Sequence, residues 1–382
     1  MPASGSESFV PVCSTDLIRG HDGSVPESLR VAYTLEQCWH DVPGGTAVAA
    51  LRLASELEPR SDLSIVGISG RHRRPPPAPY APDIPICRLP LARPWLYESW
   101  NRWEWPAVER CAGSIDVCHS TTVIPAATSA PHVVTIHDVA FVHAPGRFTG
   151  HGVRVMRTGL ERCRSADLVM CPSESVATDL VELGFDRGRL RVVPWGVDHI
   201  DVDADDVARV RKTHALPDRF ILFVGTLEPR KNLDRLAAAV GRLDDPLPLV
   251  VVGASGWGAD PVVGGVDCRF LGFVPAADLV ALYASASAFA YPSLEEGFGL
   301  PVLEAMSQGA AVVTSGGTAT EEVAGRAAVL VDPLDIDSIA EGLATALDDR
   351  AAWSTLARAR AAQFSWAAAA DATQAIYREV AR

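Results

Sequence analysis

The segment AFAYPSLEEGFGLPVLEAM, residues 288–306, contains the three kinds of local structure that decide the fold. Its first residues are apolar and suit a buried strand, and the loop EEGFG follows at the carboxyl end of that strand. Pro301 then suits the first turn of a helix, where its missing N–H costs no hydrogen bond. A strand, a glycine loop and a helix in this order predict one unit of a parallel α/β sheet, in which ligands bind at the carboxyl ends of the strands.

The same strand pattern recurs along the chain between amphipathic helical segments. Buried strands are expected in the segments LRVAYT (from residue 29), LSIVGIS (63), IDVCHS (115), HVVTIHD (132), DLVMCPS (167), LRVVPWG (190), FILFVGT (220), PLVVVGA (248), CRFLGFV (268), AFAYPS (288), AAVVTS (310) and AAVLVD (327). This alternation predicts an α/β protein with two doubly wound domains in tandem and a ligand site in the cleft between them.

The length of 382 residues is too great for one compact core, which also favours two domains. We expect the first domain to span residues 29–200 and the second to span residues 201–364. The last segment, residues 365–382, is predicted as a helix that packs back on the first domain. Residues 1–28 are polar and are expected to form a flexible leader.

The composition excludes some classes of function. The chain has 34 lysine and arginine residues against 47 acidic residues, a formal net charge of −13, whereas a nucleic-acid-binding protein needs a basic surface for phosphates. The sequence has no run of about eighteen apolar residues that would span a membrane, and its N-terminus lacks the pattern of a signal peptide. The eight cysteines show no CxxC pair or zinc spacing, so a cytoplasmic protein with reduced thiols is expected.

A pair of cations follows the first strand of the second domain, in VGTLEPRKN. Gly225 at the end of this strand lets a ligand approach the backbone, and Arg230 and Lys231 can hold a diphosphate through charge-assisted hydrogen bonds. Two cations at a helix start oppose the helix dipole, at a cost of roughly 0.3–1 kcal/mol each, unless an anion offsets them. The alternative interpretation is a solvated basic pair.

The segment EEGFGLPVLEAM supplies a second place for an anion. The N-terminus of its helix offers free N–H groups and a partial positive charge, which suit a phosphate. Glu296 and Glu304 would repel that phosphate unless they face hydroxyl groups, because an ionised carboxylate only accepts hydrogen bonds. Phosphates flanked by hydroxyl groups are the chemistry of a nucleotide sugar. Each glutamate taken alone could instead be a charge that suits the helix dipole or is solvated.

Three further segments have compositions that suit more than one role. DVDAD, residues 201–205, is similar to a metal-binding pair of acids, but a helix follows at once and we interpret the acids as N-terminal caps. The segment RPWLYESWNRWEWP, residues 93–106, carries four tryptophans, which suit a core helix, an interdomain contact, or an aromatic platform for a sugar or lipid acceptor. The segment GRHRRPPPAPYAPDIP, residues 70–85, is basic and proline-rich and is predicted as an extended loop.

Together these motifs resemble glycosyltransferase family 4, whose members are retaining enzymes with two facing Rossmann-like domains, the GT-B fold. The resemblance is carried by GTLEPRKN, LVVVGASGWG, RFLGFV, EEGFGLPVLEAMSQG and TEEVAG in the second domain, and by VTIHDVAF, MCPSES and VVPWGVD in the first. It covers the chain from Leu29 onward. Trp195 and Ala311 depart from the family, which favours a smaller polar residue and a proline at these positions, so the local loop shape is expected to differ there.

The resemblance implies roles for individual residues. Arg230 and Lys231 would bind the donor diphosphate, Glu304 the ribose hydroxyls and Glu296 the transferred sugar. His137, at the cleft end of a strand, would lie near that sugar. Further donor contacts are expected from the glycine loop of the first domain and from the second domain, at Gly44, Gly45, Gly225, Thr226, Phe273, Gly297, Phe298, Gly299 and Leu300.

The sequence therefore predicts a glycosyltransferase that uses no metal and no cofactor and moves a sugar from a nucleotide diphosphate to an acceptor hydroxyl. The resemblance implies retention at the anomeric carbon, and it favours GDP-mannose over UDP sugars as donor. A nucleotide-sugar epimerase, and a non-catalytic partner that binds nucleotide or glycan, are the alternatives. The acceptor stays open among glycan, lipid-linked and small molecules, as do a peripheral contact with the inner membrane face and the role of Glu322 in TEEVAG.

Overall fold

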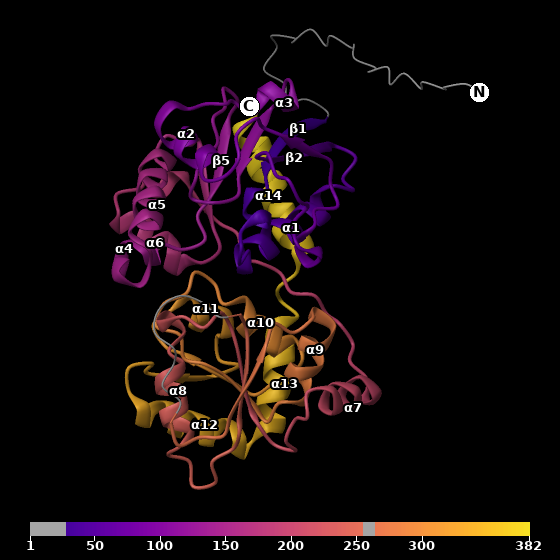
Figure 1. The fold of residues 1–382 in the computed structure, drawn as a ribbon, viewed down its shortest axis with the longest axis vertical. Helices are drawn as coiled ribbons and strands as arrows, with labels where there is room; N and C mark the ends of the chain where they lie inside the picture. Colours follow the sequence, from indigo (N-terminus) through magenta and orange to yellow (C-terminus); the bar gives the residue numbers. More distant parts are fainter. Residues whose placement is uncertain (1–27, 255–263) are drawn as a thin grey trace, which may run out of the picture.

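The computed structural model describes residues 28–254 and 264–382. Most of the expected leader and part of the segment LVVVGASGWG lie outside the described residues. Two α/β domains follow one another along the long axis of the molecule (Figure 1). Each domain has a parallel sheet between helices, so the predicted fold class is confirmed.

The first sheet has the strand order β3-β2-β1-β4-β5-β6-β7, and all its pairings are parallel. Its strands are β1 (Leu29–Thr34), β2 (Leu63–Ser69), β3 (Ile86–Arg88), β4 (Val117–Ser120), β5 (His132–Thr135), β6 (Leu168–Cys171) and β7 (Leu190–Val192). Strand β3 was not predicted, because this edge strand has three residues and lacks the longer apolar run by which a buried strand is recognised.

Alternate residues of these strands face two layers of helices. Val31 and Val117 belong to the apolar cluster formed with α1 (Gly44–Leu57) and with the final helix α14 (Trp366–Val380). The opposite face is covered by α2 (Trp95–Trp103), α3 (Glu109–Ala112), α4 (Ala140–His143), α5 (Gly150–Cys163) and α6 (Glu174–Glu182). The chain thus returns from the second domain to place α14 against α1 and β5 of the first (Figure 1).

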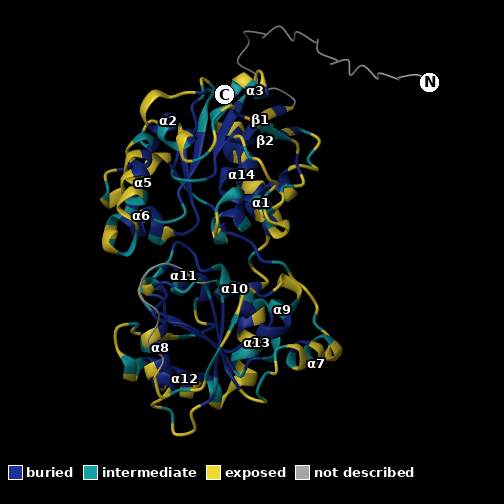
Figure 2. Ribbon diagram, in the orientation of Figure 1, coloured by how far each residue is buried: buried dark blue, intermediate teal, exposed yellow. Residues whose placement is uncertain are grey.

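The second sheet has the strand order β10-β9-β8-β11-β12-β13, again with parallel pairings. Its strands are β8 (Ile221–Val224), β9 (Leu249–Val252), β10 (Cys268–Gly272), β11 (Ala288–Tyr291), β12 (Val312–Ser315) and β13 (Val329–Val331). Its helices are α7 (Ala204–Thr213), α8 (Leu233–Val240), α9 (Ala276–Ser285), α10 (Leu300–Ser307), α11 (Ala319–Ala324), α12 (Ile336–Asp348) and α13 (Arg350–Ala361). Figure 2 shows that the strands of both sheets are the most buried parts of the molecule.

The DVDAD segment forms a helix cap. The side chain of Asp203 accepts a hydrogen bond of 2.8 Å from the backbone N–H of Asp206 at the start of α7. This confirms the capping interpretation for Asp203. Within residues 28–254 and 264–382, no group of histidine, cysteine and acidic residues has the arrangement of a metal site.

The chain crosses between the domains after β7 and again before α14, and the two crossings pack on each other. A Cβ atom at Gly196 would come within 2.0 Å of the backbone nitrogen of Trp366, so only glycine fits there. The rings of Trp195 and Trp366 stack with centroids 6.2 Å apart. Trp195, one of the two departures from the family pattern, is therefore part of the packing between the crossings.

The four-tryptophan segment divides between core and surface. Trp100 of α2 is 1% exposed and its indole N–H donates to the carbonyl of Pro106. Trp95, Trp103 and Trp105 are 70%, 68% and 43% exposed. The core interpretation is therefore right for Trp100 alone, and three indole rings remain on the surface of the first domain.

The docking of α14 depends on a buried hydrogen-bond chain and can be tested by substitution. The Tyr377 hydroxyl lies 2.6 Å from Nδ1 of His119, and Nε2 of His119 lies 2.7 Å from Oγ1 of Thr135. Burial lowers the pKa of His119 to about 3, so the ring is neutral at pH 7. Tyr377→Phe leaves one buried ring nitrogen without a partner, and we expect a loss of about 1–3 kcal/mol in the free energy of unfolding, measured in urea.

The control is Ala372→Ser, an exposed position of the same helix, which should cost no more than about 0.5 kcal/mol. A Tyr377→Phe protein as stable as this control would show that the hydrogen bond does not hold α14 in place.

Candidate active site

Loops at the carboxyl ends of strands from both sheets touch each other. A Cβ atom at Gly297, in the loop after β11, would lie 1.8 Å from the carbonyl oxygen of His137, in the loop after β5. The hydroxyl of Ser173, after β6, donates a hydrogen bond of 2.7 Å to the carbonyl of Gly297. The close approach requires glycine at position 297, and it places the site at the junction of the domains.

Two helix N-termini, one from each domain, meet at this junction. Helix α1 begins at Gly44, whose φ of +64° favours glycine, and helix α10 begins at Leu300 after Gly299, whose φ is +99°. The Cβ position of Gly45 lies 3.8 Å from Cδ1 of Leu300. The positive ends of two helix dipoles therefore converge, with free N–H groups on both sides, and this arrangement suits an anion.

A charged cluster lies beside these helix ends. Glu296 bridges two cations: its Oε1 lies 2.6 Å from Nζ of Lys231, and its Oε2 lies 3.1 Å from a guanidinium nitrogen of Arg230. Arg230 also pairs with Glu228 at 2.9 Å, and Lys231 donates to the hydroxyl of Tyr291 at 2.5 Å. Both cations belong to a 3₁₀ turn, Pro229–Lys231, that precedes α8.

This cluster gives Glu296 partners that the sequence did not predict. Its two oxygens form ion pairs with the cations, and Oε1 also accepts a hydrogen bond of 2.6 Å from the hydroxyl of Ser293, since the turn and the EEGFG loop pack together. A contact of Glu296 with the transferred sugar stays a prediction. Burial alone would raise the pKa of Glu296, but Arg230 and Lys231 lower it to about 2, so the carboxylate is ionised. Burial and Arg230 lower the pKa of Lys231. Tyr291 and Glu296 use two of the three N–H bonds of Lys231, and the third can bind a phosphate oxygen.

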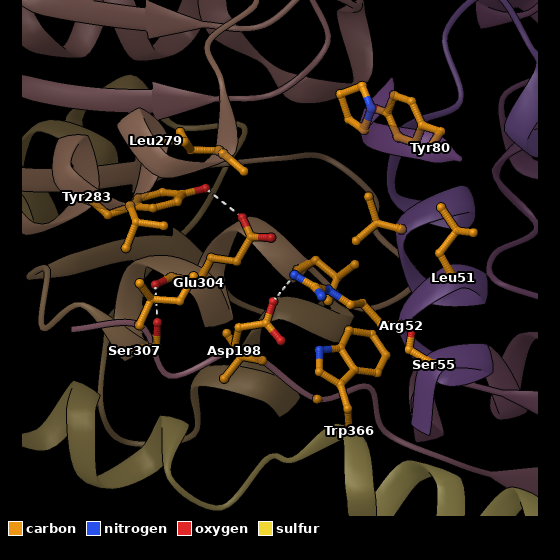
Figure 3. A pocket seen from close by; sticks show the side chains of 18 of the residues that line it. Leu51, Arg52, Ser55, Tyr80, Asp198, Leu279, Tyr283, Glu304, Ser307 and Trp366 are labelled. Carbon is orange, nitrogen blue, oxygen red and sulfur yellow. Dashed lines mark hydrogen bonds and ion pairs between the residues drawn. The ribbon is translucent and has the colours of Figure 1, made fainter. Parts of the chain in front are cut away.

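Glu304 has a different environment from Glu296. Its Oε2 accepts a hydrogen bond of 2.9 Å from the hydroxyl of Tyr283, and burial raises the pKa of its carboxyl to about 7. It lines a cavity of about 390 Å³ that has walls from both domains. Figure 3 shows Glu304 and Tyr283 on one side and Arg52 of α1, which forms an ion pair with Asp198, on the other.

The other predicted donor residues are placed as follows. Leu300 and Phe273 line the same cavity as Glu304, and Phe273 is 63% exposed. Gly225 has ordinary van der Waals room for a Cβ atom, with the nearest side chains 3.6 Å away, so packing does not require glycine there, and Thr226 follows it. The ring of Phe298 is buried against another ring, so this residue offers only its backbone to a ligand.

His137 is held by the first domain. Its Nε2 lies 3.0 Å from the carbonyl oxygen of Thr121, which assigns the N–H to Nε2. Burial lowers the pKa of His137, so the ring is neutral at pH 7 and Nδ1 is an acceptor. Its proximity to a transferred sugar stays a prediction.

Several residues of the junction had no role predicted from the sequence. Glu322 accepts hydrogen bonds of 3.0 and 3.2 Å from the backbone N–H groups of Glu174 and Ser175, so a side chain of the second domain caps helix α6 of the first. Arg52 and Tyr283 were missed because no local spacing relates them to Glu304. Residues that lie close together in the sequence could be predicted as motifs, whereas contacts between helices that are far apart in the sequence could not.

Comparisons with known proteins agree with this geometry. The family model Glycosyltransferase Family 4 matches residues 43–200, and the model Glycosyl transferases group 1 matches residues 206–364. The O-antigen chain mannosyltransferase B of Escherichia coli is 36% identical over 255 residues, which cover 61% of this chain and 66% of that protein. The D-inositol 3-phosphate glycosyltransferase of Corynebacterium jeikeium is 36% identical over 244 residues, 56% of this chain and 58% of that protein. The matches span about two thirds or less of these relatives.

Solved structures show the same arrangement of domains. Anabaena HepE in complex with UDP and glucose has a TM-score of 0.68 at 18% identity, covering 91% of this chain and 99% of that one. WaaG, a glycosyltransferase involved in lipopolysaccharide biosynthesis, has a TM-score of 0.67 at 18% identity with the same coverage. At these identities the likeness shows the fold alone, which is GT-B. Because the family models match both domains in succession, the chain belongs to glycosyltransferase family 4, the glycosyl transferases group 1.

Proposed function

We propose that the protein is a retaining glycosyltransferase that moves a hexose from a nucleotide diphosphate to an acceptor hydroxyl. The observation that carries this proposal is the convergence of two helix N-termini beside Arg230 and Lys231 at the domain junction. A diphosphate at the helix ends would have the cavity beside Glu304 next to it, and the volume of about 390 Å³ is adequate for a nucleoside.

In the proposed reaction, the protein stabilises the transition state mainly through the diphosphate leaving group. As the bond between the anomeric carbon and the phosphate oxygen breaks, negative charge grows on the diphosphate, where Lys231, Arg230 and the helix N-termini can stabilise it. The acceptor hydroxyl then attacks the anomeric carbon from the same face, and its proton passes to the departing phosphate. The protein contributes orientation and electrostatics, without a covalent sugar intermediate.

The donor is proposed to be GDP-mannose. Two of the similar Escherichia coli proteins are named as mannosyltransferases, at 36% and 34% identity. The HepE structure contains UDP and glucose, so a UDP sugar is the competing donor. Comparing GDP-mannose with UDP-glucose as substrates decides between them, and exclusive use of UDP-glucose would reject this donor proposal.

Two alternatives are separated from transfer by their products. An epimerase would convert the nucleotide sugar without an acceptor, and a non-catalytic partner would bind nucleotide or glycan without turnover. A glycosyltransferase requires an acceptor for full activity and releases a nucleoside diphosphate in equal amount to the glycoside formed. Measuring both products over one time course distinguishes the three functions.

A peripheral membrane contact is a further part of the proposal. The described residues contain no helix that is long and apolar enough to cross a bilayer. Trp95, Trp103 and Trp105 are exposed on the first domain, and exposed indole rings suit a membrane interface. Co-sedimentation with anionic phospholipid vesicles tests the contact, and a protein that stays in the supernatant would contradict it.

The role of Lys231 is tested by Lys231→Ala. Loss of one preorganised donor to developing charge typically lowers kcat about 100-fold, and we expect a decrease of that size. The matched control is Lys212→Ala, which removes an exposed cation of α7 in the same domain and should leave kcat unchanged. Turnover of Lys231→Ala within threefold of the control, roughly 0.7 kcal/mol, would remove the diphosphate assignment.

The role of Glu304 is tested by the pH dependence of nucleotide binding. With its pKa raised to about 7, Glu304 is ionised above pH 7, and the ionised form accepts hydrogen bonds roughly twice as strong as a neutral group accepts. The affinity of the wild-type protein for a nucleoside diphosphate should therefore fall as pH drops from 8 to 6. Glu304→Gln should bind the nucleoside diphosphate more weakly than wild type at pH 8, and its affinity should lack the part of the pH dependence that comes from Glu304. Calorimetry at both pH values measures the difference.

In the unliganded protein, the free energy of unfolding should depend on the same titration of Glu304, but it should decrease as pH rises. The folded pKa of about 7 lies above the ordinary value of 4.5, so the folded protein binds this proton more tightly than the unfolded chain. The contribution of Glu304 to stability is therefore present below pH 4.5 and lost as pH rises through 7. Glu304→Gln should be more stable than wild type at pH 8, by about 1–3 kcal/mol, and a less stable variant would contradict the burial argument.

Metal independence is the last part of the proposal. Arg230, Lys231 and the two helix ends can neutralise a diphosphate, and Asp203 serves as a helix cap. We expect full transfer activity after removal of divalent cations with excess EDTA. Loss of activity that manganese restores would contradict this expectation and return DVDAD to consideration as a metal site.

A further inference from the structure

A second cationic feature lies in the first domain, apart from Arg230 and Lys231. Residues 71–74, RHRR, follow β2 and are named here the basic loop. Arg71, Arg73 and Arg74 are exposed, and none of these guanidinium groups forms an ion pair with a residue that the structure describes. The chain as a whole has a net charge of −13, whereas these four positions carry three arginines without an ion-pair partner among the described residues. This local cluster of positive charge is therefore a candidate site for an anion.

The basic loop is held in a fixed conformation by buried contacts. The carboxylate of Glu36, which is 1% exposed, accepts hydrogen bonds from the Gly70 N–H at 2.6 Å and from Nε2 of His72 at 3.0 Å. The Trp39 indole N–H donates to the carbonyl of Arg74 at 3.1 Å, and its ring stacks on His72 with centroids 4.8 Å apart. The fold therefore orders the loop before a ligand arrives, which reduces the entropy that binding must overcome.

The segment that holds the basic loop, Glu36 and Gln37, is also linked toward His137. Gln37, next to Glu36, donates from its side-chain amide to Oγ1 of Thr121 at 2.7 Å. The carbonyl of Thr121 accepts from His137 at 3.0 Å. The loop follows β2 and His137 follows β5, so both lie at the carboxyl ends of strands of the first sheet.

Two buried acceptors in this connection have no donor. Oε1 of Glu36 and the side-chain oxygen of Gln37 lack a hydrogen-bond partner among the described residues. A buried acceptor without a partner costs about 1–3 kcal/mol, and such groups in a folded protein call for an explanation. A buried water, or a ligand hydroxyl that enters beneath the loop, is a donor that would satisfy them.

We propose that the basic loop binds a phosphate or diphosphate group of the acceptor, so that this protein glycosylates a phosphorylated or diphosphate-linked molecule. Guanidinium groups bind phosphate oxygens in pairs, and the Trp39–His72 stack beside them offers a flat apolar surface that suits a sugar ring. The donor diphosphate has its own cations at Arg230 and Lys231, so the basic loop is free for a second anion. The inference rests on the proposed function, because it identifies the acceptor of that reaction.

The test titrates inorganic pyrophosphate into protein that is saturated with the tighter-binding of GDP and UDP, so that the donor site is filled. We expect pyrophosphate to bind, and Arg73→Glu/Arg74→Glu to weaken this binding at least tenfold. The matched control is Lys212→Glu/Arg219→Glu, which makes the same change in charge at exposed positions in and after α7 and should alter binding less than twofold. Hydrolysis of the donor without acceptor should be equal in all three proteins.

Competition against pyrophosphate then identifies the source of the anion. Displacement by farnesyl diphosphate supports a lipid-linked acceptor, and displacement by glucose 6-phosphate supports a soluble sugar phosphate. The proposal is overturned if pyrophosphate does not bind the saturated protein, if both double variants lose binding equally, or if neither organic phosphate competes. Failure of GDP and UDP to bind would reject the proposed donor function instead. The difference in pyrophosphate affinity between Arg73→Glu/Arg74→Glu and the control double variant would still show whether the basic loop binds the anion.

Discussion

The arrangement of the site depends on the buried carboxylate of Glu296 between Arg230 and Lys231. An unpaired charge in such a place would be strongly unfavourable, and the pairing offsets most of that cost. The bridge fixes the EEGFG loop to the turn before α8, and the same loop brings Gly297 against the His137 carbonyl. This electrostatic contact in the second domain therefore holds the loop that touches the first domain, beside the two helix N-termini.

The glutamates of the segment EEGFGLPVLE illustrate how environment sets the charge of a side chain. Burial acts on both and favours the neutral form. The cations around Glu296 reverse that effect and lower its pKa to about 2, whereas Glu304 has a tyrosine hydroxyl as its direct partner and keeps a raised pKa of about 7. Eight positions apart on one strand–loop–helix unit, the first is fixed as an anion, and the second can change its charge near neutral pH.

The strands and the family motifs could be predicted because they are local patterns. A buried parallel strand is an apolar run, and a cap such as Asp203 lies next to the helix that it caps. Contacts that depend on the packing of distant segments could not be predicted: β3 has too few residues for a pattern, and Glu296 faces cations that only the fold brings to it. Likewise, no spacing in the sequence indicates that Glu322 caps a helix of the other domain.

The most direct measurement of the central claim is the dissociation constant of the nucleoside diphosphate product for Glu296→Gln, beside the rate of transfer. If Arg230 and Lys231 receive the diphosphate and Glu296 holds them in place, removal of one competing negative charge should leave product affinity equal to or higher than that of wild type. Transfer should fall at least tenfold, because the EEGFG loop is no longer held by a charge and positions the transferred sugar less well. Loss of product affinity with unchanged transfer would contradict the account.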